Sequence, residues 1–414
     1  MMTATLPKSL CCPFSLDPTK HTTPDLCIRR FDRWEDVPLA DWNSATDPDS
    51  LFLQIDYLKV LQEDGPRDTQ THFVLFYKKD RPVGVALLQQ FVWRTDRSLM
   101  LHKTEDNDPF GKRVRAKIAR RAHVNMLLLG NLLLTGERAF HFLPEIAETD
   151  TLRYLQSALD ETATHYQEKL GKKIQVFFYK DFGADRYPAL EFLREKSALE
   201  LTFSPNMVMP LRTHWQTTDD YLADLTSKYR KRYRRARRKG EALETRRLSA
   251  EEIEQFTPRL FELYERILHR VRFNMMELTP GYFARMQRTL PERFYVTGYF
   301  LEGTLIGFTS TVLNGHELEA HFVGFDEQYN ASHQLYLNML FDFLEAGIQR
   351  PEVDKIHFAR TAYTIKSSLG AVPETYYSYL RMRSSLAQVV FTPLYRFMEP
   401  EEEKWEPRHP FGTN

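Results

Sequence analysis

Two stretches of the chain repeat one strand plan, and this internal repetition limits the folds open to the chain more than any other feature. Each stretch holds a pair of strand-like runs around a polar turn: His72–Tyr77 with Val83–Phe91, and Phe294–Phe300 with Leu305–Leu313. In both, a glycine (Gly84 or Gly307) stands seven residues after an aromatic residue. Such repetition predicts two related units in place of one larger core.

Later landmarks follow in the same order. A buried strand opening with Lys-Ile is expected at Lys173-Ile174 and again at Lys355-Ile356. The first copy is longer between its landmarks, and the insertion is expected from Arg94 to about His123. Helical periodicity is clearest in three segments: Asp219–Gly240, Ala250–Phe273 and Ser332–Ile348. The pattern predicts an α+β fold of two tandem units, with mixed, mostly antiparallel sheets flanked by helices.

The length of 414 residues suffices for two cores. We expect a loose arm at 1–25, an N-terminal domain at 26–205, a C-terminal domain at 206–385 that contains a basic helix at 219–240, and a tail at 386–414. The Asn314-Gly315 pair predicts a tight hairpin that leads into a strand from Glu317 to Gly324.

Composition excludes several classes of function. Lys plus Arg and Asp plus Glu are balanced at 56 each, so no global field attracts DNA, and a basic site must be local. The three cysteines (Cys11, Cys12 and Cys27) form no metal-binding spacing and predict no disulfide framework, which suits a reducing cytoplasm. The longest apolar run, Val124–Leu134, is too short to span a bilayer. No signal peptide and no metal site are expected.

The sharpest local feature is a basic helix. From Lys228 to Lys239, nine of twelve residues are cationic and none is acidic. Tyr221, Tyr229 and Tyr233 recur at helical spacing, so one face can pack while the rest stays positive. A solvated basic face or a nucleic-acid patch explains the run as well as an anion site does.

This run resembles the KxR…(I/V)RxAxxxG signature of FemAB-type transferases. The matching residues are Lys228-Tyr229-Arg230 and then Tyr233 to Gly240. FemAB-type enzymes are two fused GNAT-like domains that add amino acids to peptidoglycan precursors, and related CelD-like proteins are described as acyl-CoA transferases. The resemblance implies a bacterial acyltransferase in which Arg230 contacts a substrate phosphate, with Arg234 beside it on the helix.

A second segment resembles the family's F-K-x-x-F-G ending, where a lysine serves the transfer site. Lys366 and Gly370 fit that spacing, although Leu369 replaces the aromatic residue. From the residues alone, a lysine after a buried strand is expected to be exposed. The resemblance makes Lys366 the candidate for stabilising an oxyanion, with Arg360 and Thr361 as neighbours for the same anion.

Between these motifs lies the segment from Glu319 to Asp326, followed by Tyr329. In GNAT-like folds this is the central strand along which the acyl donor lies, and Tyr329 is a candidate substrate contact. Strand alternation places Glu319, His321 and Val323 on one face, and either Glu319 or His321 can take a proton from an attacking amine. A half-buried, hydrogen-bonded histidine without a catalytic role is the alternative.

The stretch Gln328–His333 contains no glycine, unlike the loop that cradles the coenzyme A pyrophosphate in ordinary GNAT enzymes. We nevertheless expect an N-acyltransferase that moves an acyl group from acyl-CoA, or a related activated donor, to the amine of an anionic or phosphate-bearing acceptor. That acceptor is a small molecule or is lipid-linked, and no metal takes part.

Two other readings stay open. A transferase that uses aminoacyl-tRNA would place RNA against the basic helix. A peripheral membrane or nucleic-acid-binding protein is the other class, and here the basic stretch from Lys112 to Arg121 precedes the apolar run. The cytoplasm, including the inner face of the membrane, is the expected location.

Overall fold

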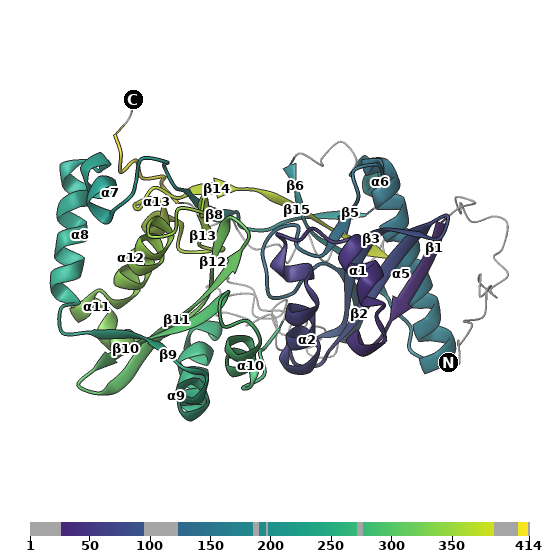
Figure 1. Ribbon diagram of the computed structural model, residues 1–414, viewed down its shortest axis with the longest axis horizontal. Helices are drawn as coiled ribbons and strands as arrows, with labels where there is room; N and C mark the ends of the chain where they lie inside the picture. The colour runs from purple at the N-terminus through teal and green to yellow at the C-terminus, as the bar shows by residue number, and fades with distance from the viewer. Residues whose placement is uncertain are drawn as a thin grey trace, which may run out of the picture.

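The computed structural model describes residues 26–94, 123–184, 190–195, 198–270, 276–384 and 405–412. Two mixed sheets, one of eight strands and one of seven, lie side by side, with helices on their faces (Figure 1). The N-terminal arm, most of the expected insertion after Arg94 and the basic stretch from Lys112 to Arg121 lie outside the described residues.

Apart from β5, the two units are built from the same succession of elements. The first contains β1 (Leu26–Phe31), α1 (Leu39–Ser44), α2 (Ile55–Asp64), β2 (Thr69–Lys78), β3 (Arg81–Arg94), β4 (His123–Leu129), β5 (Phe140–Phe142), α5 (Glu148–Leu170), β6 (Val176–Gly183), α6 (Glu191–Glu195) and β7 (Leu199–Thr202). The second contains β9 (Glu244–Leu248), α9 (Ala250–Leu268), α10 (Tyr282–Thr289), β10 (Phe294–Leu301), β11 (Thr304–Asn314), β12 (Glu317–Phe325), α12 (Leu335–Ile348), β13 (Lys355–His357), α13 (Tyr363–Ser367) and β14 (Val372–Glu374). β6 begins at Val176, three residues after the expected Lys173, whereas β13 does open with Lys355.

Seven strands have the same order in both sheets. The first runs β1-β2-β3-β4-β6-β15-β7 and the second β9-β10-β11-β12-β13-β8-β14, where β8 is Asn206–Pro210 and β15 is Tyr376–Met382. The eighth strand of the first sheet, β5, pairs with β3. In each, four antiparallel strands are followed by one parallel pair, β4 with β6 or β12 with β13, and then by antiparallel strands again. The predicted duplicated α+β fold is confirmed.

The units exchange one strand. β8 follows β7 in the chain but pairs with β13 and β14 of the second sheet, and β15 follows β14 but pairs with β6 and β7 of the first. β15 reaches from one lobe to the other (Figure 1). A domain boundary at 385 therefore assigns β15 to the wrong sheet. The residue pattern of β15 does not reveal which sheet the strand joins, because the same alternation of side chains suits either sheet.

The paired glycines mark a bulge that both units share. Gly84 lies opposite Phe76, and the register shifts before Tyr77, whereas Gly307 lies opposite Tyr299 and the register shifts before Phe300. A Cβ atom on either glycine would overlap a side chain packed on the sheet, Phe142 or Met339. The glycine leaves room for that packed side chain, and the register shifts directly before the aromatic residue. The recurring glycine and aromatic residue therefore mark the same bulge in both units.

One apolar core is shared by the two units. Buried side chains of α1 and α2 meet those of α9 and α10 between the sheets, and α2 contacts α10 directly. α5 covers the outer face of the first sheet, and α12 packs on the outer face of the second together with α8 (Ser227–Lys239). The predicted helix at 219–240 is two helices, because α7 (Thr218–Asp224) ends before α8 begins. Among the described residues, no helix is long and apolar enough to cross a bilayer.

Ser378→Ala tests the strand exchange. The Ser378 hydroxyl in β15 accepts from the backbone N–H of Asp181 at 2.9 Å and donates to its carboxylate at 3.2 Å, and both residues are fully buried. We expect the variant to lose about 1–3 kcal/mol of unfolding free energy in urea titrations, because the partners stay buried without this hydroxyl. The exposed Ser332→Ala should change it by less than about 0.5 kcal/mol. Equal, small effects would mean that β15 does not lie beside β6.

Candidate active site

The strands β12 and β13 part after a short parallel contact. They pair at Glu317, Leu318 and Glu319, the last lying opposite His357. From Ala320 to Phe325, β12 pairs with β11 along one edge, and no described strand pairs with its other edge. A strand edge of this kind presents unpaired backbone donors and acceptors to a ligand. Glu319 and His321 lie where the strands part, which makes this point the candidate active site.

His321 is the extra residue of a bulge in β12. Ser310 lies opposite Phe322 and Thr311 opposite Ala320, and the Phe322 N–H donates to the Ser310 hydroxyl at 3.0 Å. The predicted alternation of faces is therefore wrong here, because one inserted residue shifts every side chain after it. His321 and Phe322 both contact the ring of Tyr282, whereas Ala320 and Val323 both pack in the core beneath α12.

Aromatic rings enclose the imidazole of His321. Its Nε2 lies 2.7 Å from the Tyr282 hydroxyl, and the rings of Phe294 and Phe322 approach it edge-on. Burial lowers the pKa of His321 to about 3, because the apolar surroundings disfavour the charged ring. His321 is therefore neutral throughout the physiological range, and it is a weak base.

Arg138 joins the first unit to the start of β12. Its guanidinium donates to Glu319 at 2.9 Å and also pairs closely with Glu317. Arg138 belongs to residues 130–138, here called the junction loop, which follow β4 and lie against the second unit. The expected catalytic carboxylate, Glu319, thus has a partner from the other half of the chain.

Glu317, Glu319 and His357 also have the spacing of a metal site, with ligand atoms within 4.8 Å of one another. Cations of the protein already occupy these carboxylates, since Lys355 pairs with Glu317 at 2.8 Å in addition to Arg138. Burial works to raise the pKa of Glu317, but the hydrogen bond with His357 and the charge of Arg138 outweigh it and hold that pKa well below its usual range. We assign no metal to this cluster.

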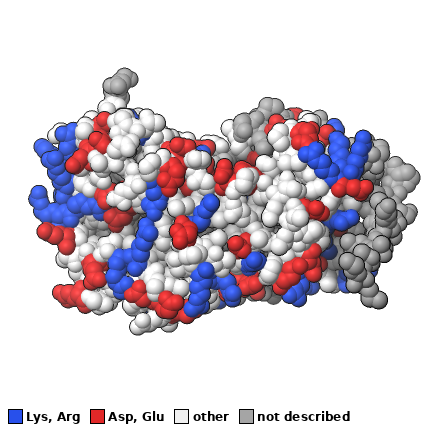
Figure 2. Space-filling model, viewed as in Figure 1, with Lys and Arg blue, Asp and Glu red and all other residues white. Residues whose placement is uncertain are grey.

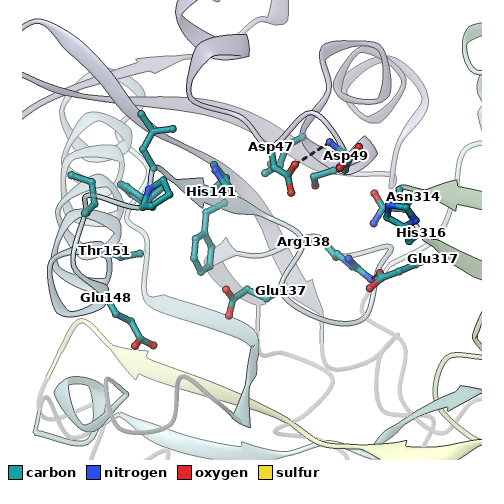
Figure 3. Close-up of a pocket in the computed structure, with 18 residues that line it drawn as sticks. Asp47, Asp49, Glu137, Arg138, His141, Glu148, Thr151, Asn314, His316 and Glu317 are labelled. Atoms are coloured by element: carbon teal, nitrogen blue, oxygen red, sulfur yellow. Dashed lines mark hydrogen bonds and ion pairs between the residues drawn. The ribbon is translucent and has the colours of Figure 1, made fainter. Parts of the chain in front are cut away.

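A cavity of about 560 Å³ opens at the junction beside Arg138 and Glu317 (Figure 3). The first unit contributes the walls around His141 and Thr151, and the β11–β12 turn contributes the edge at Asn314. Five carboxylates line it: Asp47, Asp49, Glu137, Glu148 and Glu317. One arginine, Arg138, faces this set, so the cavity favours a cationic ligand.

Lys366 was expected to be exposed, and it is buried, with 3% of its surface accessible. Its ammonium donates to the carbonyls of Ala359 and Arg360, at 3.1 and 2.8 Å. These carbonyls belong to a loop in which Ala359, Thr361 and Ala362 all have positive φ. Lys366 holds this unfavourable backbone in place, and its hydrogen bonds are directed to the loop.

The remaining candidates near this loop and after β12 lie apart from one another. Arg360 pairs with Asp181 of β6 at 2.5 Å and stacks on Phe203, so its guanidinium binds the first unit. Thr361 is exposed on the loop. Tyr329 lies in the turn after β12, partly buried beside His333. No hydrogen bond or ion pair between described residues links these side chains to Glu319 or His321.

Arg230 and Arg234 have different environments on α8. The Arg230 guanidinium donates to the carbonyls of Leu222, Ala223 and Leu225, where it caps the end of α7. Arg234 is exposed and belongs to a row of cations that form no ion pair within the described parts of the chain: Lys228, Lys231, Arg234, Arg235 and Arg238. Figure 2 shows basic side chains gathered along the left edge of the molecule, where α8 lies in Figure 1.

Two residues at the site carry no signal that the sequence analysis used. Arg138 stands in the junction loop, and Tyr282 lies on α10. Each belongs to a segment without a motif. The position of the junction loop directly after β4 was the one usable clue to Arg138.

Comparison with known proteins supports the same architecture. Residues 227–367 match the family model described as an acetyltransferase (GNAT) domain. No curated protein sequence matches the chain. The solved structure of FemX aligns over 90% of this chain and 100% of its own with a TM-score of 0.50 and 12% identity. A tandem GNAT protein from the clavulanic acid biosynthesis pathway aligns over 87% and 99% with a TM-score of 0.50 and 14% identity. These likenesses confirm the predicted tandem GNAT-like fold.

Lys366→Met tests the burial of this lysine. Burial lowers the pKa of Lys366 to about 7, so between pH 7 and the ordinary lysine pKa the unfolded chain holds a proton that the folded chain loses. Stability therefore rises with pH across this window in the wild type, by roughly a few kcal/mol. Urea unfolding at pH 7 to 10 should show this rise relative to Lys366→Met. A constant difference between the two proteins would show that Lys366 keeps its proton.

Arg230→Ala and Arg234→Ala form a matched pair on one helix. Loss of Arg230 leaves carbonyls at the end of α7 without donors, so we expect unfolding free energy to fall by about 1–3 kcal/mol. Arg234→Ala should change it by less than about 0.5 kcal/mol, because the side chain is exposed. Denaturant titrations compare the two, and equal losses would contradict the capping role of Arg230.

Proposed function

We propose that this chain, a GNAT-superfamily acyltransferase of two tandem GNAT-like units, transfers an acyl group from an activated donor to the nitrogen of an amine. The observation that carries the proposal is the parting of β12 and β13 beside Glu319 and His321. It lies within the segment that matches the GNAT domain. The N-terminal unit supplies Arg138 to the same point, so both halves contribute to one site.

The open edge of β12 supports acyl-CoA as the donor. An extended chain that carries amides can hydrogen-bond to a free strand edge as another strand would, and the pantetheine arm of coenzyme A carries two amides. The turn after β12 offers no open amide cradle for a diphosphate at its start. The N–H groups of Gln328 and Tyr329 already donate to Asp326, at 3.3 and 3.2 Å. Side chains would therefore hold the diphosphate.

The acceptor in this proposal is a cationic amine. The carboxylates of the junction cavity attract a protonated amine, and the cavity reaches Glu317 and Arg138 beside Glu319. The amine must lose a proton to attack a carbonyl carbon, and Glu319 is the candidate acceptor of that proton. The phosphate-bearing acceptor expected from the family resemblance gains no support from this cavity, because its lining is acidic.

Aminoacyl-tRNA is a second candidate donor, favoured by one observation. The exposed cations of α8 stand three to four residues apart without acidic partners among the described residues, so they offer a continuous row to backbone phosphates. Binding by this row would weaken steeply with salt. The amine would attack the carbonyl carbon in the same way, but the bond that breaks would be the ester of the aminoacyl-tRNA instead of the thioester of acyl-CoA.

Glu319→Gln tests the function. Purified enzyme is incubated with an amine library and either acetyl-CoA, longer acyl-CoAs or charged tRNA, and acylated products are identified by mass spectrometry. With the donor that supports transfer, we expect Glu319→Gln to lower kcat by roughly 10²–10⁴, because the carboxylate no longer accepts the proton.

Glu35→Gln is the matched control. Glu35 is exposed in the first unit and pairs with Arg33 at 2.8 Å, away from the parting strands and from the turn after β12, so kcat should stay near the wild-type value. Full activity of Glu319→Gln would contradict its role. Transfer from charged tRNA alone would replace acyl-CoA with the second donor.

A further inference from the structure

The junction cavity lies where the first unit departs from the plan of the second. Positions along β3 and β11 can be matched through the bulge that both units share. On this basis Leu129 of β4 takes the place of Ala320, and Phe140 of β5 takes the place of Val323. β4 and β5 together therefore correspond to β12, with the junction loop inserted where β12 carries His321. Because β5 and the start of α5 line the cavity, it lies on the part of the first unit that corresponds to the proposed donor edge of β12.

The carboxylates of this cavity differ in whether the protein neutralises them. Glu317 pairs with both Arg138 and Lys355, and Arg138 also pairs with Glu319, so two carboxylates face two cations at this end. Asp47 and its neighbour Asp49 lie in the loop after α1, and the Asp47 carboxylate accepts from the backbone N–H of Asp49 at 3.0 Å. Neither of these two carboxylates forms an ion pair with a residue that the structure describes. The unbalanced negative charge is therefore separate from the reactive end of the cavity.

A metal ion does not fit this unbalanced charge. A metal site needs several ligand atoms close together, and in the described ranges the acidic group that meets this need is Glu317, Glu319 and His357, within 4.8 Å of one another. Asp47 and Asp49 belong to no such group. Separate carboxylates along a cavity of about 560 Å³ suit an organic cation whose charges are spread along a chain.

Asn314 adds an unused hydrogen-bond donor to the same cavity. It is 5% exposed, and its side-chain oxygen accepts from the Leu51 N–H at 2.7 Å. Its Nδ2 group has no partner among the described residues, and Asn314 lines the cavity beside His316 (Figure 3). Because Nδ2 only donates, it recognises an oxygen acceptor and not an ammonium group. Asn314 pairs with Glu317 across the β11–β12 turn, which places this donor near the reactive end.

We propose that the acceptor is an aliphatic diamine with a hydroxyl or carbonyl oxygen between its two nitrogens. One amine reacts beside Glu319, the oxygen accepts from Asn314, and the second amine stays protonated against Asp47 and Asp49. This inference rests on the proposed acyl transfer and names the class of its acceptor. In the step itself the N–C bond forms as the C–S bond of the donor breaks, and the proton of the reacting amine passes through Glu319 to the sulfur that leaves. The second ammonium group keeps its proton throughout.

Calorimetry on the full chain without any donor tests the binding. The probes are diaminopropane with an amino group at each end, diaminopropanol with a hydroxyl added on the central carbon, and propylamine. We expect diaminopropanol to bind about threefold to tenfold more tightly than diaminopropane, which is the value of one hydrogen bond. Both diamines should bind more tightly than propylamine, because each carries a second charge for the carboxylates. Equal affinities for the two diamines, or for the diamines and propylamine, would overturn the proposal.

Variants locate the binding. Asp47→Asn with Asp49→Asn should weaken the binding of diaminopropanol by roughly fivefold and that of propylamine by less, because only the diamine presents a second ammonium group. Asp36→Asn with Asp219→Asn removes the same charge from exposed positions outside the cavity and should change neither affinity. Asn314→Ala should abolish the advantage of diaminopropanol over diaminopropane, and its remaining affinity for diaminopropane shows that the variant is folded. Equal losses in the two double variants would contradict the site.

The proposed function and the diamine assignment can fail separately. Diamine binding with this pattern, but without acylation of the bound diamine by any donor, would count against the proposed function alone. Acyl transfer to monoamines without the expected pattern of diamine binding would count against the diamine assignment alone. Where transfer occurs, Asp47→Asn with Asp49→Asn should raise KM for diaminopropanol more than it lowers kcat, because the second ammonium group takes no part in the bond changes.

Discussion

The buried carboxylate of Asp181 is the interaction on which the arrangement of the two units depends. It is fully buried in β6, with Lys180 and Arg360 both at 2.5 Å. Burial works to raise the pKa of Asp181, but the charges of Lys180 and Arg360 outweigh it and hold that pKa at about 2. A buried carboxylate that lost one partner would destabilise the fold strongly, by about 3–5 kcal/mol. Because Arg360 comes from the loop after β13, this ion pair joins the second unit to the first.

The strand exchange also supplies a hydrogen-bond donor to the Asp181 carboxylate. β15 brings Ser378 to Asp181, and the junction loop brings the N–H of Gly136 to it at 3.2 Å. Once the junction loop is held there, its Arg138 side chain reaches the second unit and meets Glu319. The arrangement that stabilises the junction therefore also builds the candidate site.

The site itself follows from an interruption in a regular sheet. β12 must pair with β11 along its length, yet it leaves β13 after Glu319 and carries an inserted residue at His321. The bulge turns His321 and Phe322 toward α10, and the parting frees one backbone edge for a ligand. A continuous pair of strands at this position would be more regular and would leave no open edge for the donor that we propose.

The sequence by itself determined the local elements and their repetition. The strand-like runs around Gly84 and Gly307 predicted the two strand pairs, the apolar periodicity predicted α9 and α12, and the short motifs pointed to the GNAT-like family and to the strand that carries Glu319 and His321. Only the tertiary structure decided which sheet receives β15, that Lys366 is buried beneath its loop, and that Arg138 from the first unit reaches Glu319 in the second. Periodicity and motifs depend on neighbours along the chain, whereas these decisions depend on burying charges and hydroxyls between segments that are far apart in it.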